Sequence, residues 1–266
     1  MRLKHNRITI LEYKLTITYT RLPNPLKLPI FLNEKWAPKF GQIEVVSLNK
    51  LRNVNKCLRW VHFSVETDKD IQLEKALTII SDEEKARAGI FRFDRDRDRF
   101  VRGRGYLRSI LAECLDITPE TLDLKRHEHG KLYLEGDPVY FNLTHSAGAG
   151  VIAVSAEHPV GVDLEFVNRK VKVLDVARTV LADRELDYLE ATRAEDRERL
   201  FLYFWTAKEA YLKLLGTGLS LEPKKVSLQL GSKFPVGCET KGYSEGKLTY
   251  LDLHDDSAIC CLCRAR

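Results

Sequence analysis

Residues 139–167 read VYFNLTHSAGAGVIAVSAEHPVGVDLEFV and contain three short apolar runs in quick succession. The runs are VYFNLT, GVIAVSA and VGVDLEFV, and each is rich in the β-branched and aromatic residues that favour strands. The links between the runs, HSAGAG and EHP, are too short to hold a crossover helix, so neighbouring strands are expected to pair antiparallel. The stretch therefore predicts a β-meander.

Predicted helices and further strands lie on both sides of this stretch. Upstream, WVHFSVE predicts a strand and SDEEKARAGIF a helix, because Ser81 and Glu84 have the spacing of a capping box. The helix is expected to continue through FDRDRDRFVRGRGYLRSILAECL, where charges at i,i+3 spacing form a solvated face. Downstream, ADRELDYLEAT and RERLFLYFWTAKEAYLKLLG predict helices, the second ending at Gly216, and KVSLQL, KLTYLDL and AICCLC predict strands. The order strand, long helix, strands therefore occurs twice.

The charge of the chain is unevenly distributed. The 266 residues carry a formal net charge of +5, but residues 1–56 hold 11 Lys and Arg against 3 Asp and Glu. The remaining 210 residues hold 32 basic and 35 acidic groups, so the body of the protein lacks the basic surface typical of nucleic-acid binding. Prolines in RLPNPLKLP oppose a regular helix, and residues 1–56 are interpreted as a basic N-terminal extension.

Targeting segments and metal-binding cysteine patterns are not evident in the sequence. No apolar run approaches the ~18 residues of a membrane-spanning helix, and the N-terminus lacks the apolar block of a secretory signal. A cytoplasmic protein without membrane contact is therefore expected. The six cysteines include no spaced pair with a nearby His that would complete a zinc site, and the alternation in AICCLC favours a strand.

Three carboxylates and a lysine are the strongest candidates for chemistry. Asp163 and Glu165 are two apart on a predicted strand, so both side chains leave the same face, either as solvated acids or as Mg²⁺ ligands. On the predicted helix, Glu209 and Lys213 are one turn apart and form either a solvated ion pair or a third acid with a lysine beyond it. Such a set suits phosphoryl chemistry, and metal-dependent nucleases also combine these residue types.

Groups that could bind a phosphate lie nearby in the predicted fold. His145 ends a strand just before small residues, where ring nitrogens and backbone N–H groups can converge on an anion. In the first long helix, Arg102, Arg104 and Arg108 have few acidic neighbours at helical spacing and are candidate anion binders. The sequence has no GxxxxGK[ST] and no GxGxxG motif after a strand, which argues against ordinary nucleotide-binding folds.

With these residues assembled, the chain resembles the 4′-phosphopantetheinyl transferases, specifically the large monomeric type that activates surfactin synthetase. The resemblance is carried by HGKLYL (129–134), FNLTHS (141–146), GVDLE (161–165) and FWTAKEAYLK (204–213), in the family's order. It implies an α+β fold of two similar halves related by a pseudo-twofold axis, with mainly antiparallel strands. The expected divisions are an extension at residues 1–56, a first half at 57–158 and a second half at 159–266.

The resemblance also implies an activity. A holo-[acyl-carrier-protein] synthase transfers the phosphopantetheine arm of coenzyme A to a serine of an apo acyl- or peptidyl-carrier protein, in fatty acid, polyketide or nonribosomal peptide biosynthesis. The other product is adenosine 3′,5′-bisphosphate. A monomer that uses Mg²⁺, or Mn²⁺ in its place, and binds neither nucleic acid nor membrane is expected. The alternatives are a Mg²⁺-dependent nuclease and a non-catalytic carrier-binding protein.

Site roles carried over by the resemblance fall on specific positions of this chain. Asp163, Glu165 and Glu209 resemble the metal ligands, with Asp163 also in the coenzyme A site. Glu209, or a metal-bound water, is the expected base, and Lys213 the expected lysine near the pyrophosphate. The remaining coenzyme A contacts are expected at Arg87, Arg104, Lys131, Thr144 and His145. The chain departs from the family pattern at Leu132, where proline is usual, and at Thr144, where serine is usual but a hydroxyl is kept.

Overall fold

The computed structural model describes residues 5–10, 15–20, 58–67, 71–167, 173–232 and 234–266. Most of the predicted extension at 1–56 lies outside these residues. The described part of it comprises β1 (His5–Ile10) and β2 (Leu15–Thr20), an antiparallel pair in which Ile8 is opposite Ile17. Among the helices that the structure describes, none is both long enough and apolar enough to cross a membrane.

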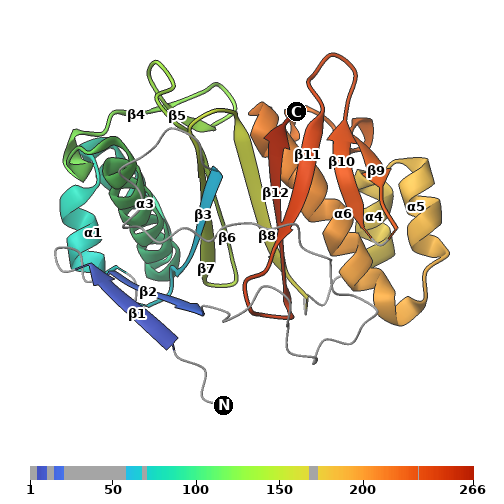
Figure 1. Ribbon diagram of the computed structural model, residues 1–266, viewed down its shortest axis with the longest axis horizontal. Coiled ribbons are helices and arrows are strands. Elements are labelled where there is room, and N and C mark those ends of the chain that lie inside the picture. Colours follow the sequence, from blue (N-terminus) through green and yellow to red (C-terminus); the bar gives the residue numbers. More distant parts are fainter. Residues whose placement is uncertain (1–4, 11–14, 21–57, 68–70, 168–172, 233) are drawn as a thin grey trace.

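The first half is a three-stranded sheet covered by three helices (Figure 1). The sheet has the order β3-β7-β6 and is antiparallel throughout. The elements are β3 (Leu58–Ser64), α1 (Leu73–Ile79), α2 (Asp82–Ala88), α3 (Asp94–Leu115), η3 (Pro119–Thr121), the hairpin strands β4 (Leu124–Arg126) and β5 (Leu132–Leu134), β6 (Tyr140–Ser146) and β7 (Ala149–Ser155).

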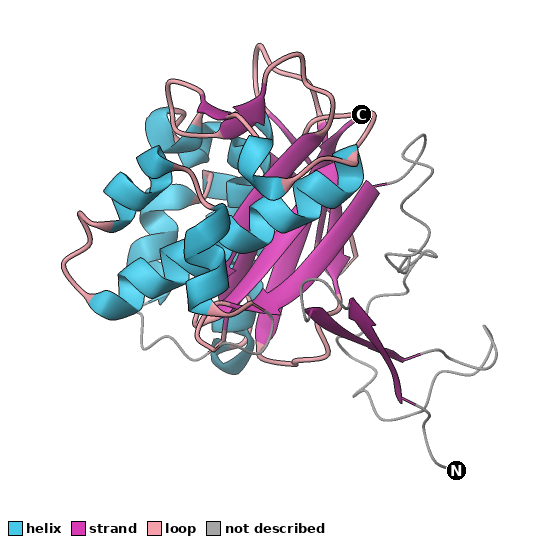
Figure 2. Ribbon diagram, turned by 90° about the vertical axis from the view of Figure 1, so that its left-hand side faces the viewer, coloured by secondary structure: helices cyan, strands magenta, loops and turns pink. Residues whose placement is uncertain are grey.

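The second half is a five-stranded antiparallel sheet of order β8-β12-β11-β10-β9, again with three helices. Its elements are β8 (Val160–Phe166), α4 (Val173–Val180), α5 (Asp183–Glu190), α6 (Ala194–Leu215), η4 (Gly218–Ser220), η5 (Pro223–Lys225), β9 (Ser227–Leu230), β10 (Pro235–Glu239), β11 (Gly246–Leu251) and β12 (Ala258–Ala265). The helices of both halves lie on one side of the strands (Figure 2). The α+β prediction of two similar halves is confirmed.

The predicted meander is wrong at its third strand. β6 and β7 form the expected hairpin, with His145 opposite Gly150. β7 pairs with β3 and β6 on its two edges, so it has no free edge for β8. β8 instead pairs antiparallel with β12, where Asp163 is opposite Cys261, and it lies alongside β6. The two sheets thus meet at the facing edges of β6 and β8 (Figure 1).

The start of α2 follows the predicted capping box. Ser81 Oγ accepts a hydrogen bond from the Glu84 backbone N–H at 3.2 Å, and Glu84 Oε2 accepts one from the Ser81 N–H at 3.0 Å. The predicted continuation into the next helix is wrong, because α2 ends at a Gly89 C-cap and α3 begins afresh at Asp94.

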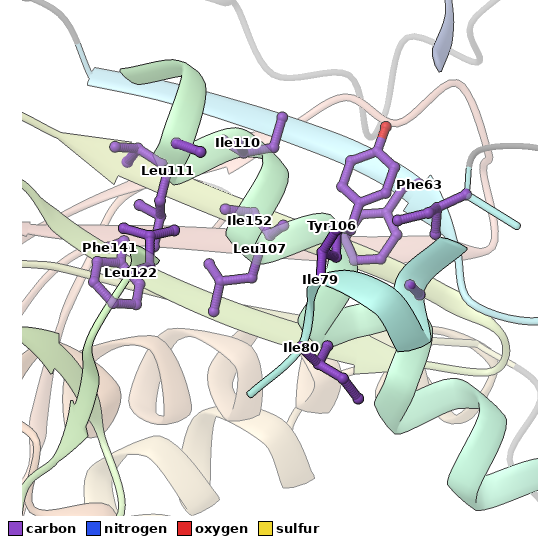
Figure 3. Packing of buried hydrophobic residues seen from close by; sticks show 14 of the residues in the cluster. Phe63, Ile79, Ile80, Tyr106, Leu107, Ile110, Leu111, Leu122, Phe141 and Ile152 are labelled. Atoms are coloured by element: carbon purple, nitrogen blue, oxygen red, sulfur yellow. The ribbon is translucent and has the colours of Figure 1, made fainter. Parts of the chain in front are cut away.

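The core of the first half forms where α1 and α3 pack on the sheet (Figure 3). The rings of Phe63 and Tyr106 stack with centroids 4.2 Å apart. Gly105 allows α3 to approach α1, since a Cβ atom there would lie 2.7 Å from the Cβ of Ala76. Close packing of α3 therefore depends on this glycine.

A buried ion pair joins the helices of the first half. Arg108, which is 1% exposed, donates from Nε to Glu84 Oε2 at 2.6 Å and from Nη1 to the carbonyls of Pro119 and Leu122 at 2.9 Å each. Glu84 is also the carboxylate that caps α2. The interpretation of Arg108 as an anion binder is therefore wrong, since this arginine joins α2, α3 and η3.

The second half repeats this network with different residues. Lys208 is fully buried, and its Nζ lies 2.6 Å from Glu185 Oε2 and donates to the carbonyls of Pro223 and Val226 at 2.9 and 2.8 Å. Glu185 caps the start of α5 by accepting from the Ala182 N–H at 2.9 Å, as Glu84 caps α2. A capping glutamate, a buried cation on the long helix and two loop carbonyls thus recur in the two halves.

We expect Lys208→Met to lower the free energy of unfolding by about 3–5 kcal/mol, because it leaves the buried Glu185 carboxylate without its cation. Urea unfolding measures the loss, and Lys224→Met, at an exposed position of η5, is the control. A midpoint for Lys208→Met equal to that of the control would show that the buried pair contributes nothing.

Candidate active site

The candidate site lies along the seam where the two sheets meet. Three polar side chains of β6 point toward β8, at the alternating positions Asn142, Thr144 and Ser146. Asn142 Oδ1 accepts from the Val162 backbone N–H at 2.9 Å. Ser146 Oγ lies 3.1 Å from Glu165 Oε2 and Thr144 Oγ1 lies 3.3 Å from Asp163 Oδ1. At these points side chains of one half bond directly to groups of the other half.

The predicted lysine and carboxylates come together at the middle of this seam. Lys213 of α6 donates from Nζ to Asp163 Oδ1 at 2.6 Å and to Thr144 Oγ1 at 3.1 Å. Asp163 and Thr144 are both 5% exposed and the Lys213 side chain is 27% exposed, so the lysine is the member of the triad most accessible to solvent. The Lys213 ammonium thus pairs with Asp163 on β8, whereas the i,i+4 spacing would suggest Glu209 on its own helix.

Two carboxylate oxygens in the cluster have unsatisfied lone pairs. Asp163 Oδ2 and Glu209 Oε1 are buried and accept no hydrogen bond from the described residues. Burial, followed by the charge of Asp163, raises the pKa of Glu209 to about 7, with Lys213 opposing and Glu165 adding to the shift. Buried acceptors of this kind cost free energy unless a cation or a donor satisfies them. The cluster is therefore suited to receive positive charge.

The charge of Lys213 is stabilised by the same carboxylates. Burial lowers its pKa, but the Asp163 carboxylate, with smaller contributions from Glu209 and Glu165, outweighs burial and raises the pKa overall. Lys213 is therefore protonated across the physiological range and can stabilise a developing oxyanion.

In the described part of the chain, no three His, Cys, Asp or Glu side chains lie close enough together to form a ready-made metal site. Lys213 Nζ occupies one side of the Asp163 carboxylate. The unpartnered oxygens of Asp163 and Glu209, with Glu165 two residues along β8, are nevertheless the hard oxygen donors that Mg²⁺ prefers. The donor set therefore fits a divalent cation in chemistry.

Two of the predicted phosphate contacts of the first half, His145 and Arg104, lie in a basic region near the cluster. Partial desolvation by the surrounding protein lowers the pKa of His145, and the positive charges of Lys213, Arg99 and Arg104 lower it further. Arg104 is largely buried, and its Nε and Nη1 atoms lack hydrogen-bond partners among the described residues. Burial lowers its pKa to about 10, partly offset by Glu84. Unsatisfied donors among like charges are what an anion would stabilise.

A single aromatic ring connects two of the predicted arginines. The guanidinium carbons of Arg87 and Arg104 lie 5.8 and 5.3 Å from the centroid of the Phe100 ring. Arg87 of α2 and Arg104 of α3 therefore both lie near the same ring of α3, although 17 residues separate them in the sequence.

Lys131 contacts backbone carbonyls and not the carboxylates of Asp163 and Glu209. Its Nζ donates to the backbone carbonyls of Val160 and Leu214, at 3.2 and 2.9 Å. The side chain lines a pocket of about 380 Å³ between the β4–β5 hairpin and the end of α6, with Tyr133, Tyr140 and Thr217 among the other lining residues. Leu132, which replaces the usual proline, also lines this pocket.

Sequence reasoning missed two residues of the seam, Asn142 and Ser146. Both lie two residues from Thr144 on β6, so strand periodicity places them on the same face as a residue that was predicted. That periodicity was the available signal. The position of β8 beside β6 was not predicted, because the order of the strands in the sequence favoured pairing of β8 with β7.

Comparison with protein families finds two matches that together cover most of the described chain. Residues 159–263 match the model described as the 4′-phosphopantetheinyl transferase superfamily. Residues 67–157 match the model described as 4′-phosphopantetheinyl transferase, N-terminal.

Individual proteins show the same likeness. The 4′-phosphopantetheinyl transferase HetI of Nostoc sp. is 35% identical over 163 residues, which cover 59% of this chain and 68% of that protein. The 4′-phosphopantetheinyl transferase Sfp of Bacillus subtilis is 27% identical over 167 residues, or 62% of this chain and 73% of that protein. A crystal structure of Thermotoga maritima holo-[acyl-carrier-protein] synthase aligns with a TM-score of 0.33 at 22% identity, over 41% of this chain and 62% of that one.

Proposed function

The chain belongs to the 4′-phosphopantetheinyl transferase superfamily, and we propose that it transfers the phosphopantetheine arm of coenzyme A to a serine of an apo acyl- or peptidyl-carrier protein. The observation that carries the proposal is the hydrogen-bonded triad of Lys213 with the buried Asp163 and Thr144, with unpartnered carboxylate oxygens beside it. Because both sides of this site come from one chain, we further propose that the enzyme acts as a monomer.

In the proposed reaction, the serine oxygen attacks the β-phosphorus of coenzyme A. The new bond joins that oxygen to phosphorus, and the bond to the bridging oxygen of the pyrophosphate breaks. Adenosine 3′,5′-bisphosphate leaves with the bridging oxygen. Lys213, which carries a positive charge, stabilises the negative charge that develops there.

Glu209 is the proposed acceptor of the serine proton. Its Oε1 is buried and unpartnered, and its pKa of about 7 places it near the optimum for a general base at neutral pH. A neighbouring water is the alternative acceptor.

Asp163, Glu165 and Glu209 would hold Mg²⁺, or Mn²⁺ in its place, which when bound neutralises pyrophosphate charge. Thr144 would then orient Asp163 through its hydroxyl, at 3.3 Å from Asp163 Oδ1. Arg104, Arg87 and His145 would receive the nucleotide phosphates on the first-half side, because Arg104 has donors to spare there.

The proposal is tested by the second product. Incubation of the full chain with coenzyme A, Mg²⁺ and an apo carrier should release adenosine 3′,5′-bisphosphate, measured by chromatography, only when the carrier is present. Release of mononucleotides from added DNA or RNA, with no effect of the carrier, would instead support a nuclease.

Replacing His145 with Ala is expected to weaken coenzyme A binding by about 1–3 kcal/mol, the range for a lost hydrogen bond to a charged group. Calorimetry with coenzyme A and with dephospho-coenzyme A, which lacks the 3′-phosphate, shows which phosphate is contacted. His254→Ala, at an exposed position of the second half, is the control. If wild type and His145→Ala lose the same factor on removal of the 3′-phosphate, His145 does not bind that group.

A further inference from the structure

Lys131 connects the two halves of the molecule. It precedes β5 in the β4–β5 hairpin of the first half, and both carbonyls that accept from its Nζ belong to the second half. Val160 is the first residue of β8 and Leu214 lies in the last turn of α6. One side chain of the hairpin therefore reaches across the seam to a strand and a helix of the other half.

The carbonyl of Leu214 needs such a donor. The last carbonyl groups of a helix have no intrahelical partner, and a cation at this end also interacts favourably with the helix dipole. The Gly216 N–H closes the helix by donating to Leu212, which leaves the Leu214 carbonyl for Lys131. Gly216 adopts the left-handed conformation at φ 75°, and a Cβ there would approach Lys131 Cδ to 3.3 Å.

The two acceptors also flank Lys213 and Asp163 in the sequence. Leu214 directly follows Lys213, and Val160 lies three residues before Asp163. β8 and α6 are in backbone contact, because a Cβ on Gly161 would lie 2.0 Å from the Ala210 carbonyl oxygen. The strand and the helix thus behave as one unit, and Lys131 binds the first half to it.

We infer that Lys131 is a positioning residue that holds the first half against the β8–α6 unit and so keeps Thr144 in register with Asp163 and Lys213. This inference rests on the proposed function only for its effect on turnover. It differs from the role of phosphate ligand that the family resemblance implies. Burial lowers the pKa of Lys131 to about 8, as expected for an ammonium group whose close partners are neutral carbonyls, with Asp137 only partly offsetting burial.

The test compares Lys131→Met, which keeps the aliphatic stem, with Lys131→Arg, which keeps donors. Lys125→Met is the matched control, because Lys125 is on the same hairpin but pairs with the exposed Glu135. Hydrogen exchange and Tm are measured on the full chain without coenzyme A. The coenzyme A Kd is measured by calorimetry, and kcat at saturating coenzyme A.

For Lys131→Met we expect amide exchange in the last turn of α6 and in the β4–β5 hairpin to accelerate together by about tenfold, as for loss of a hydrogen bond to a charged donor. Tm should fall by about 2–4 °C. At temperatures where the variant is folded, kcat should fall by about tenfold and recover in Lys131→Arg, whereas a purely structural role would leave kcat unchanged. Lys125→Met should match wild type.

Unchanged exchange and Tm in Lys131→Met would overturn the inference, and a weaker coenzyme A Kd as the sole change would identify a phosphate ligand. If Lys131→Met does not fold, Lys131→Gln takes its place. Because exchange and Tm require no turnover, an inactive wild type would refute the proposed function without deciding the role of Lys131.

Discussion

Replacing Asp163 with Asn should lower kcat by about 10²- to 10³-fold, the loss typical when one electrostatic contact to a transition state is removed. Asp163 is the carboxylate that Lys213 and Thr144 share, and its second oxygen is buried without a partner. Asn has the same shape but no charge, so it cannot balance Lys213 or serve as a hard anionic ligand. The seam should keep its geometry but lose the ion pair between Asp163 and Lys213.

Steady-state kinetics with coenzyme A and an apo carrier measure this loss, and the thermal transition shows whether the variant is folded. Asp175→Asn, at an exposed carboxylate of α4, is the control and should match wild type. Turnover of Asp163→Asn within a factor of about two of wild type would contradict a role for this carboxylate in the reaction.

Glu209→Gln should lower turnover by about 10²- to 10⁴-fold, the range for removal of a general base. The same substitution should raise Tm at neutral and alkaline pH. The Glu209 carboxyl is buried beside Asp163, and its pKa lies at about 7 in the folded protein against 4.5 for the free side chain. A neutral amide of the same shape removes that unfavourable charge, so activity and stability are expected to change in opposite directions.

The pH dependence gives a second, independent measurement. Between pH 4.5 and about 7 the folded state holds a proton on Glu209 that the unfolded state has released. This contribution to stability is therefore present at low pH and is lost as the pH rises through that window. Wild-type Tm measured against pH without divalent cations should include this fall, and Glu209→Gln should lack it. Parallel profiles for the two proteins would show that Glu209 ionises normally.

Local signals in the sequence predicted much of the fold. The Ser81 and Glu84 spacing predicted the start of α2, and Gly216 predicted the end of α6, since caps depend on neighbouring residues. Partners of strands depend on distant residues and were less predictable. β8 was expected beside β7 because it follows β7 in the chain. In the structure that edge of β7 pairs with β3, which is distant in sequence.

The candidate site shows the same division between local and distant information. Strand periodicity placed Asp163 and Glu165 on one face, which the structure also shows in their contacts to β6. Charge type alone did not separate Lys213 from Lys208 on the same helix. Lys208 is fully buried with Glu185 and two loop carbonyls, whereas Lys213 faces the seam. The contacts of such cationic side chains depend on tertiary partners, as those of Arg108 and Lys131 also show.

The most direct test of the account is the intact mass of an apo carrier protein after incubation with the full chain, coenzyme A and Mg²⁺. The proposed function predicts that the carrier gains the mass of one phosphopantetheine group, and that neither a carrier with its acceptor serine changed to alanine nor the Asp163→Asn enzyme gives this product at a comparable rate. An unchanged carrier mass across acyl- and peptidyl-carrier proteins that an established transferase does modify would contradict it.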